Sequence, residues 1–354
     1  MSENFITIRQ AKEMPKQKLN KKTFSFIDLF AGIGGFRLAL EDSGGTCVFS
    51  SEWDANSQDV YLKNFAELPH GDITKIKEKE IPKHDVLCAG FPCQAFSISG
   101  KRLGFKDVRG TLFFDVARIV KYHKPNVLFL ENVKNLAGHD KKNTLNTILN
   151  VLDDIGYKVF FEILKSSNYG LPQARERIYI IAFKKRLGIK KFNFPKPTRQ
   201  IKIVNDILEA KKYIPEACYI NRPDITIYGK EKKVIDPKRP LQIGKLNNGG
   251  QGERIYSTYA SGITLLAYGG GAASKTGAYF VNGKVRKLTP RECARMQGFP
   301  ESFILPKNRN IAYRQLGDSV SVPVIKAIFK KIIEKYPRLN DKRKLSSIKK
   351  SVKK

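Results

Sequence analysis

The first half of the chain alternates short apolar runs with helical patterns, and this alternation restricts the fold more than any other feature. The runs are nearly continuous, as in FSFIDLF at 24–30, which is typical of strands buried on both faces. Between them, residues 111–123 place Phe113, Val116 and Val120 at helical spacing. We expect strands at 24–30, 47–51, 85–89, 127–130 and 178–183, and helices at 36–42, 52–65, 111–123 and 143–155. The sequence therefore predicts an α/β fold whose parallel sheet carries helices on both faces.

The pattern changes after Arg186. Pro195 and Pro197 mark a boundary, and glycine-rich stretches with interspersed tyrosines follow. We expect a smaller, loop-rich β domain here, because glycines between strands let the backbone approach a ligand closely. Helical patterns at 289–296 and 323–336 then return the chain to the first domain. The predicted divisions are 12–200, 201–288, 289–340 and a basic tail at 341–354.

The charge of the chain points to a polyanionic partner. Lys and Arg number 65 against 33 Asp and Glu, a net charge of +32. Residues 1–23 carry +4 of this and residues 326–354 carry +10, so the body between them keeps +18. An excess of this size favours nucleic acid or an anionic surface, although a generally lysine-rich composition would give the same value.

Composition also excludes several classes of protein. No stretch approaches the ~18 consecutive apolar residues of a membrane span, and 22 Phe with 14 Tyr are too many for a disordered chain. The five cysteines are irregularly spaced, so we expect neither a disulfide framework nor a zinc site. The first residues lack the apolar core of a secretory signal, and we expect a cytoplasmic protein.

A glycine-rich turn follows the first strand. Gly32, Gly34 and Gly35 open the next helix, an arrangement that lets a nucleotide approach the backbone. Glu52 lies 20 residues after Gly32, at the end of the following strand, where a carboxylate can accept hydrogen bonds from ribose hydroxyls. NAD and S-adenosylmethionine both fit this pattern, but the GxGxxG form of NAD sites would need glycine where Arg37 stands. Tight packing alone is the alternative.

A cysteine follows the strand expected at 85–89. Pro92 stiffens the backbone before Cys93, and the C-terminal edge of a parallel sheet is where α/β proteins place their sites. A lone cysteine is usually a small buried hydrophobe, so this segment alone leaves a nucleophile and a core thiol equally open. The polar stretch 97–110 is suited to closing over a substrate as a lid.

A carboxylate and two guanidinium groups belong to further strand ends. Glu131 ends the strand at 127–130, and a carboxyl near a buried thiol has a raised pKa and can act as an acid. Arg175 and Arg177 are two residues apart, so both would face one side of a strand. They are suited to holding a phosphate, or to orienting Glu131 and polarising a carbonyl oxygen. Surface salt bridges are the alternative.

In this order and spacing, these segments resemble the DNA (cytosine-5) methyltransferases. The segments that carry the resemblance are FAGIGG at 30–35, GFPC at 90–93, ENV at 131–133, QARER at 173–177 and the stretch from Arg291 to Pro300. The resemblance covers residues 23–324. It implies a Rossmann-like catalytic domain with a smaller target-recognition domain.

The resemblance also implies a catalytic mechanism. The thiolate of Cys93 would add to carbon 6 of cytosine and make carbon 5 nucleophilic. Glu131 would protonate or hydrogen-bond ring N3, Arg177 would hold the base oxygen, and Arg175 would lie nearby. Because a base inside a duplex cannot reach the thiol, the target cytosine would be flipped out.

By the same resemblance the cofactor is S-adenosylmethionine, which becomes S-adenosylhomocysteine, and no metal is expected. Trp53 is suited to stacking on the adenine and Asp72 to accepting from its amino group. The implied cofactor-binding residues are Phe30, Gly32, Gly34, Gly35, Glu52, Trp53, Asp72, Ile73, Pro92, Leu112 and Asp318.

The partner implied is double-stranded DNA. Gln251 would fill the space left by the flipped cytosine and Arg254 would read guanine in the major groove. The implied DNA-binding residues are Ser99, Gln251, Arg254, Thr264, Tyr268, Gly269 and Gly270. The loop 250–257 is similar to that of family members that methylate GCGC, so we predict the first cytosine of GCGC as target. We also expect a monomer with a restriction-modification role, whose cognate endonuclease acts separately.

Two residues depart from the family pattern. Asp318 stands where the family has asparagine, which would put an anion near the methionine carboxylate of the cofactor. Leu266 replaces a serine of the GCGC-methylating members and removes a polar contact.

Two other functions stay open. One is an RNA cytosine methyltransferase, which transfer of labelled methyl to tRNA would identify. The other is a catalytically silent DNA-binding module. An NAD dehydrogenase has no use for Cys93.

Overall fold

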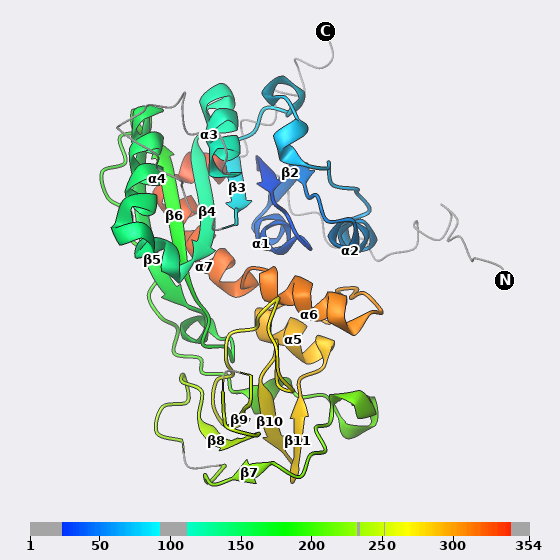
Figure 1. The fold of residues 1–354 in the computed structure, drawn as a ribbon. Coiled ribbons are helices and arrows are strands. Elements are labelled where there is room, and N and C mark those ends of the chain that lie inside the picture. The colour runs from blue at the N-terminus through cyan, green and yellow to red at the C-terminus, as the bar shows by residue number, and fades with distance from the viewer. Residues whose placement is uncertain (1–22, 93–111, 232–233, 251, 341–354) are drawn as a thin grey trace, which may run out of the picture.

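The chain forms two sheets joined by a group of helices (Figure 1). This computed structural model describes residues 23–92, 112–231, 234–250 and 252–340. The larger sheet has six strands: β1 (Phe24–Leu29), β2 (Gly45–Ser51), β3 (Val86–Gly90), β4 (Val127–Val133), β5 (Tyr157–Lys165) and β6 (Glu176–Lys184). Their order across the sheet is β2-β1-β3-β4-β6-β5.

Strands β2, β1, β3 and β4 are parallel, as the alternation of strands and helices predicts. The expectation of a parallel sheet is wrong at β6, which runs antiparallel to both β4 and β5. The connection between β5 and β6 has no room for the crossover that parallel neighbours need. Strand β5 was not expected. It is an edge strand whose middle residues are largely exposed, and Lys158 and Glu162 interrupt its apolar residues.

Helices cover both faces of this sheet. Helices α1 (Gly35–Asp42) and α7 (Val322–Lys335) pack on one face, and α3 (Leu112–His123) and α4 (Asn143–Asp154) on the other. Successive residues of β1 divide between the faces, since Phe26 belongs to the first cluster and Ile27 to the second. The expected helices on both faces are therefore confirmed. Helix α2 (Ala55–Phe65) follows β2.

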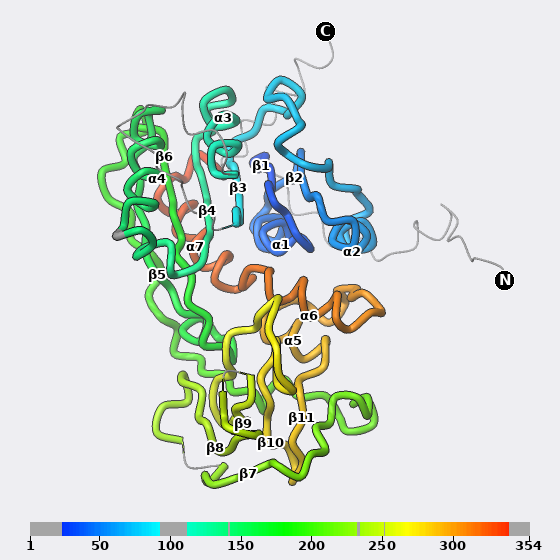
Figure 2. Tube along the Cα trace, in the orientation of Figure 1, coloured from blue at the N-terminus to red at the C-terminus, as the bar shows by residue number. Residues whose placement is uncertain are grey.

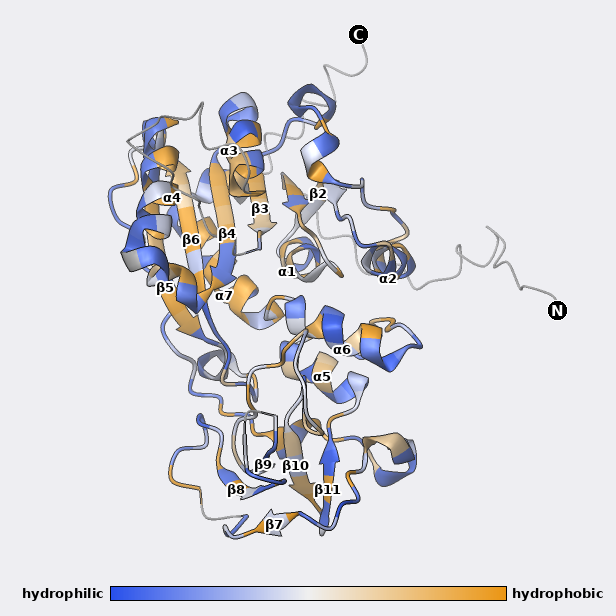
Figure 3. Cartoon of the chain, in the orientation of Figure 1, coloured by the Kyte–Doolittle hydropathy of each residue, from blue (hydrophilic) through white to orange (hydrophobic). Residues whose placement is uncertain are grey.

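The smaller sheet has the strand order β11-β10-β9-β8-β7. Its strands are β7 (Thr226–Ile227), β8 (Gln242–Lys245), β9 (Arg254–Ser257), β10 (Ala278–Val281) and β11 (Lys284–Lys287). A separate small core under it includes Ile243, Ile255 and Val285. Figure 3 shows the contrast: β3, β4 and β6 are largely apolar, whereas β8 and β11 are hydrophilic. The predicted smaller β domain with many loops is present.

Helices α5 (Pro290–Gln297) and α6 (Arg309–Asp318) lie between the two sheets, as the trace in Figure 2 shows. Helix α5 begins with a capping box, in which Thr289 accepts from the Glu292 amide and Glu292 accepts from the Thr289 amide. Helix α6 was not expected from the sequence. Within the described parts of the chain, no helix is long and apolar enough to cross a membrane.

Candidate active site and neighbouring pocket

The glycine-rich turn is fastened to the end of β2 by Glu52. The two carboxylate oxygens of Glu52 accept hydrogen bonds from the backbone amides of Gly32 and Asp54, each at 2.8 Å. Burial raises the pKa of this carboxyl, and the two amide hydrogen bonds oppose the shift. The carboxylate is thus held at the C-terminal edge of the parallel strands, next to the turn.

Two glycines of the turn have different surroundings. Gly32 has φ +54°, and no atom lies within 4 Å of the place where a side-chain carbon would stand. Gly34 has φ +85°, and a side-chain carbon there would overlap the ring of Phe65. Gly34 therefore serves the packing of the turn on α2, whereas Gly32 leaves space that a ligand can occupy.

The segment that bears the predicted adenine-binding residues lies beside this turn. The Glu52 amide donates to the His70 carbonyl at 2.8 Å, which brings 70–73 to the end of β2. Asp72 accepts from the amide and the hydroxyl of Thr74, and these bonds lower its pKa. Trp53 is 79% exposed, whereas Ile73 is buried.

Other predicted cofactor residues lie at the ends of their elements. Phe30, with φ +55°, follows β1, and Leu112 begins α3; both are half-buried. Pro92 is exposed just after β3. Asp318 ends α6, where desolvation raises the pKa of its carboxyl against the charges of Arg175 and Arg314.

Strands β3 and β4 end together. Gly90 is paired with Glu131 in the ladder, and the Asn132 amide side chain donates to the Phe91 carbonyl at 2.8 Å. This bond fixes the backbone two residues before Cys93. Cys93, Ser99 and the lid predicted at 97–110 lie outside the described residues.

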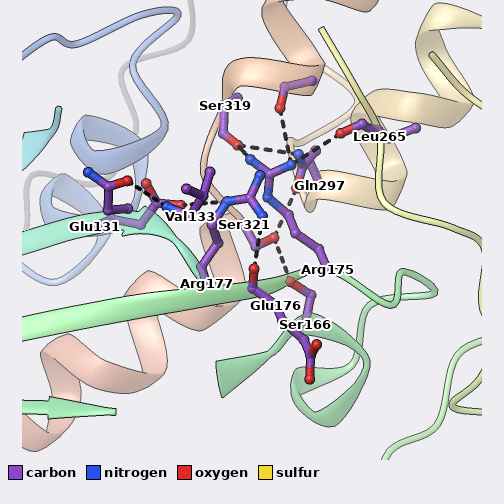
Figure 4. Close-up of polar contacts among 12 residues, drawn as sticks. Glu131, Val133, Ser166, Arg175, Glu176, Arg177, Leu265, Gln297, Ser319 and Ser321 are labelled. Atoms are coloured by element: carbon purple, nitrogen blue, oxygen red, sulfur yellow. Dashed lines mark hydrogen bonds and ion pairs between the residues drawn. The ribbon is translucent and has the colours of Figure 1, made fainter. Parts of the chain in front are cut away.

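Glu131 and Arg177 form an ion pair across β4 and β6 (Figure 4). The Oε1 atom of Glu131 lies 3.2 Å from Nε of Arg177. Glu131 is 7% exposed, and burial raises its pKa although Arg177 and Arg175 oppose the shift. The site thus combines a buried carboxyl that holds its proton more firmly than usual with a neighbouring cation.

Arg175 has different partners from Arg177. Its guanidinium donates to the backbone carbonyls of Leu265, Gly317 and Ser319, which come from distant parts of the chain. Arg175 is 2% exposed, and burial together with Arg177 lowers its pKa to about 10. The sequence showed no sign of these partners.

Most of the predicted DNA-binding residues line one pocket. This pocket, of about 560 Å³, lies beside the smaller sheet. Its lining includes Arg254, Thr264, Tyr268, Gly269 and Gly270, all predicted to bind DNA. Gln251 lies outside the described residues. The pocket adjoins the segment that carries Arg177, because the Thr264 hydroxyl donates to the Ala174 carbonyl at 3.3 Å.

Sequence reasoning missed the role of Arg37. This nearly buried residue of α1 forms ion pairs with Glu41 and Glu67, both at 2.9 Å, and donates to the Tyr61 hydroxyl at 3.2 Å. It thereby joins the helix after the glycine turn to α2. A charged residue at an apolar position of α1 was the available signal.

Comparison with known proteins identifies the family. The sequence profile described as C-5 cytosine-specific DNA methylase matches residues 24–334. The chain belongs to this family. As a C-5 cytosine-specific DNA methylase it is an enzyme, a DNA (cytosine-5-) methyltransferase, and the family implies S-adenosylmethionine as its cofactor.

Curated relatives agree over most of their length. The methylase is 53% identical over 303 residues to the type II methyltransferase M.HhaI of Haemophilus parahaemolyticus. This match covers 86% of this chain and 92% of the relative. The methylase is 46% identical over 340 residues to the type II methyltransferase M.HpaII of Haemophilus parainfluenzae, and that match covers 91% of this chain and 92% of the relative.

Solved structures show the same fold. The Entamoeba histolytica methyltransferase EhMeth has a TM-score of 0.66 at 20% identity, with 89% of this chain and 99% of that one covered. The S. pombe Dnmt2 methyltransferase has a TM-score of 0.65 at 19% identity, covering 88% and 98%. In the described part of this methylase, no three His, Cys, Asp or Glu residues are grouped to hold a metal ion.

Proposed function

We propose that the enzyme flips a cytosine out of duplex DNA and methylates carbon 5 through a covalent adduct with Cys93. The observation that carries this proposal is the Glu131–Arg177 pair at the strand edge that leads to Cys93. A thiolate that adds to carbon 6 makes carbon 5 nucleophilic, which explains the need for a cysteine. After the methyl group is in place, carbon 5 loses its proton and the thiolate leaves.

Glu131 and Arg177 divide the work on the cytosine ring. The raised pKa of Glu131 favours the protonated carboxyl, which donates to ring N3 and stabilises the charge that forms when the thiolate adds. Arg177 holds the base oxygen and keeps Glu131 in place. Glu131 is buried and the Arg177 side chain is only 14% exposed, so their low-dielectric surroundings would strengthen both interactions.

The glycine turn and its surroundings fit S-adenosylmethionine. The space over Gly32 admits the ligand, and the carboxylate of Glu52 keeps acceptor capacity for the ribose hydroxyls. Trp53 would cover the adenine and Asp72 would accept from its amino group, while Phe30, Ile73, Pro92 and Leu112 supply apolar contacts. When bound, the cofactor supplies the electrophilic methyl group.

We assign target recognition to residues 201–288 and catalysis to 12–200 and 289–340. Arg254 is exposed in the pocket and is suited to bidentate contact with guanine, while Tyr268, Gly269 and Gly270 bring aromatic surface and backbone to the bases. Together with Ser99, Gln251 and Thr264 they would select GCGC. The body charge of +18 would neutralise phosphates.

We further propose that the enzyme is a monomer in the bacterial cytoplasm and the modification half of a type II system. The names of its relatives support this role. The cognate endonuclease would act separately.

Methylation sequencing of DNA from cells that express the chain tests the proposal. We expect 5-methylcytosine at the first cytosine of GCGC, with protection from a nuclease that cuts GCGC. Cys93→Ser should abolish both and should form no adduct with 5-fluorocytosine DNA, whereas the unsubstituted enzyme should form one. Full cleavage of DNA from cells with the unsubstituted enzyme would overturn the target, and methyl transfer to tRNA instead of DNA would overturn the substrate.

A further inference from the structure

Arg175 lies at the junction of three segments that are far apart in sequence. Its Nη1 atom donates to the carbonyls of Leu265 at 3.3 Å and Gly317 at 3.1 Å, and Nη2 donates to the Ser319 carbonyl at 2.8 Å (Figure 4). One rigid guanidinium thus holds carbonyls from two segments in a fixed relative position. Lysine, with a single ammonium group, lacks this planar fork.

Gln173 holds Leu265 from its other side. The Gln173 Oε1 atom accepts from the Leu265 amide at 3.0 Å, so side chains of 173–175 engage both backbone polar groups of Leu265. Gln173 also donates to Gln297 at 3.2 Å, and Gln297 donates to the Leu316 carbonyl at 2.8 Å. Leu265 and the end of α6 are therefore connected by two side-chain routes, one through Arg175 and one through Gln173 and Gln297.

Gly317 shows how closely the segments approach. A side-chain carbon at Gly317 would overlap the backbone of Leu266 and Ala267. Backbone atoms do not give way like the end of a flexible side chain, so only glycine permits this contact. The end of α6 and the segment 265–267 pack backbone against backbone.

Each of these segments belongs to a different binding site. Thr264 and Leu266 line the pocket beside the smaller sheet, the proposed DNA site. Ser319 and Val320 lie against Gly35 of the glycine turn, since a side-chain carbon at Gly35 would meet both. The contact held by Arg175 therefore connects the two sites.

We infer that Arg175 is a positioning residue that couples cofactor binding to DNA binding by fastening 265–267 to the end of α6. This inference rests on the proposed function, because it takes the pocket as the DNA site and the turn as the cofactor site. It assigns Arg175 no contact with the cytosine, since its observed hydrogen bonds go to backbone carbonyls.

The coupling is measured by titrating S-adenosylhomocysteine into the free protein and into its complex with a short duplex of the methylated sequence. We expect the duplex to tighten binding of S-adenosylhomocysteine about 5-fold to 150-fold, and this ratio of affinities is the coupling factor. S-adenosylhomocysteine should tighten duplex binding by the same factor. In Arg175→Lys each ligand alone should bind within about threefold of the unsubstituted protein, while the coupling factor falls close to 1. Gln173→Met, a milder change, should reduce it partly.

Arg291→Lys is the matched control. Arg291 also donates to two backbone carbonyls, those of Pro300 and Phe303, but it lies away from the junction. It should keep the full coupling factor. A factor near 1 in the unsubstituted protein, or an unchanged factor in both Arg175→Lys and Gln173→Met, would overturn the inference. Slow methyl transfer with intact coupling in Arg175→Lys would also overturn it and indicate contact with the substrate. Because the coupling factor comes from the binding titrations and not from the methyl-transfer rate, failure of the proposed chemistry would be seen separately.

Discussion

Glu131 of β4 and Arg177 of β6 are diagonal neighbours across the two antiparallel strands, with Oε1 of the carboxyl 3.2 Å from Nε of the guanidinium. The carboxyl is buried, and its raised pKa shows that burial outweighs the attraction of the two nearby arginines. The pair lies where β3 and β4 end together, at the edge where a parallel sheet places its chemistry.

Glu131→Gln should reduce turnover about 10²-fold to 10⁴-fold, because glutamine cannot deliver a proton to the ring. The proposed reactive form of the unsubstituted enzyme is the one with the protonated carboxyl. The methyl-transfer rate of the unsubstituted enzyme should therefore fall as pH rises through the raised pKa of Glu131, and this fall should be absent from the residual rate of Glu131→Gln. Labelled methyl transfer to DNA across a pH series measures both effects. A glutamine variant with the unsubstituted rate would exclude Glu131 as the acid.

Gly34→Ala and Gly32→Ala form a matched pair. At Gly34 an added carbon overlaps Phe65 and the backbone has φ +85°, so we expect a loss of about 2–5 kcal/mol in the free energy of unfolding. At Gly32 the carbon meets no atom, so only the left-handed backbone penalty of about 1–2 kcal/mol should apply.

Cofactor binding should separate the two variants further. The Gly32→Ala methyl group would enter the space assigned to the cofactor and weaken S-adenosylhomocysteine binding more than its small loss of stability explains. Urea unfolding and calorimetric titration measure the two quantities. Equal cofactor affinity in Gly32→Ala and the unsubstituted protein would place the ligand elsewhere.

The sequence predicts those features that depend on neighbouring residues. The turn and the spacing to Glu52 are local patterns that a parallel sheet brings to one edge, and the structure joins them directly. The partners of Arg175 were not predictable, because Leu265 and Gly317 reach it only through tertiary packing. Helix α6 was missed for a related reason, since its sequence is mostly polar and its buried residues include Gln315 and Gly317, which give no apolar pattern.

The buried ion pair between Arg286 and Glu292 should support the junction between β11 and α5. The two side chains make two hydrogen bonds of 2.8 Å, and Glu292 also accepts from the amides of Thr289 and Glu209. Glu292→Ala leaves a buried guanidinium without its counter-charge, so we expect a loss of about 3–5 kcal/mol in urea unfolding.

Glu301→Ala is the control for this pair. Glu301 pairs with Arg295 at 2.7 Å, but its side chain is 64% exposed, so its removal should cost only about 0–1 kcal/mol. Similar losses in the two variants would mean that burial does not set the strength of the Arg286–Glu292 pair.

Asp318→Asn should tighten cofactor binding. Desolvation raises the pKa of Asp318, while the charges of Arg175 and Arg314 act against the shift. As pH rises through this pKa the carboxylate forms and would repel the methionine carboxylate, so affinity for S-adenosylhomocysteine should decline with pH in the unsubstituted protein.

The asparagine variant should show no such decline and should bind S-adenosylhomocysteine roughly fivefold more tightly above that pKa, equivalent to about 1 kcal/mol. Asp54→Asn serves as the comparison, because Asp54 already pairs with Arg314 at 2.8 Å. Calorimetry that finds no gain in affinity for S-adenosylhomocysteine in Asp318→Asn would contradict this prediction. The carboxylate would then be turned away from the cofactor, and aspartate in place of the family's asparagine would be neutral for cofactor binding.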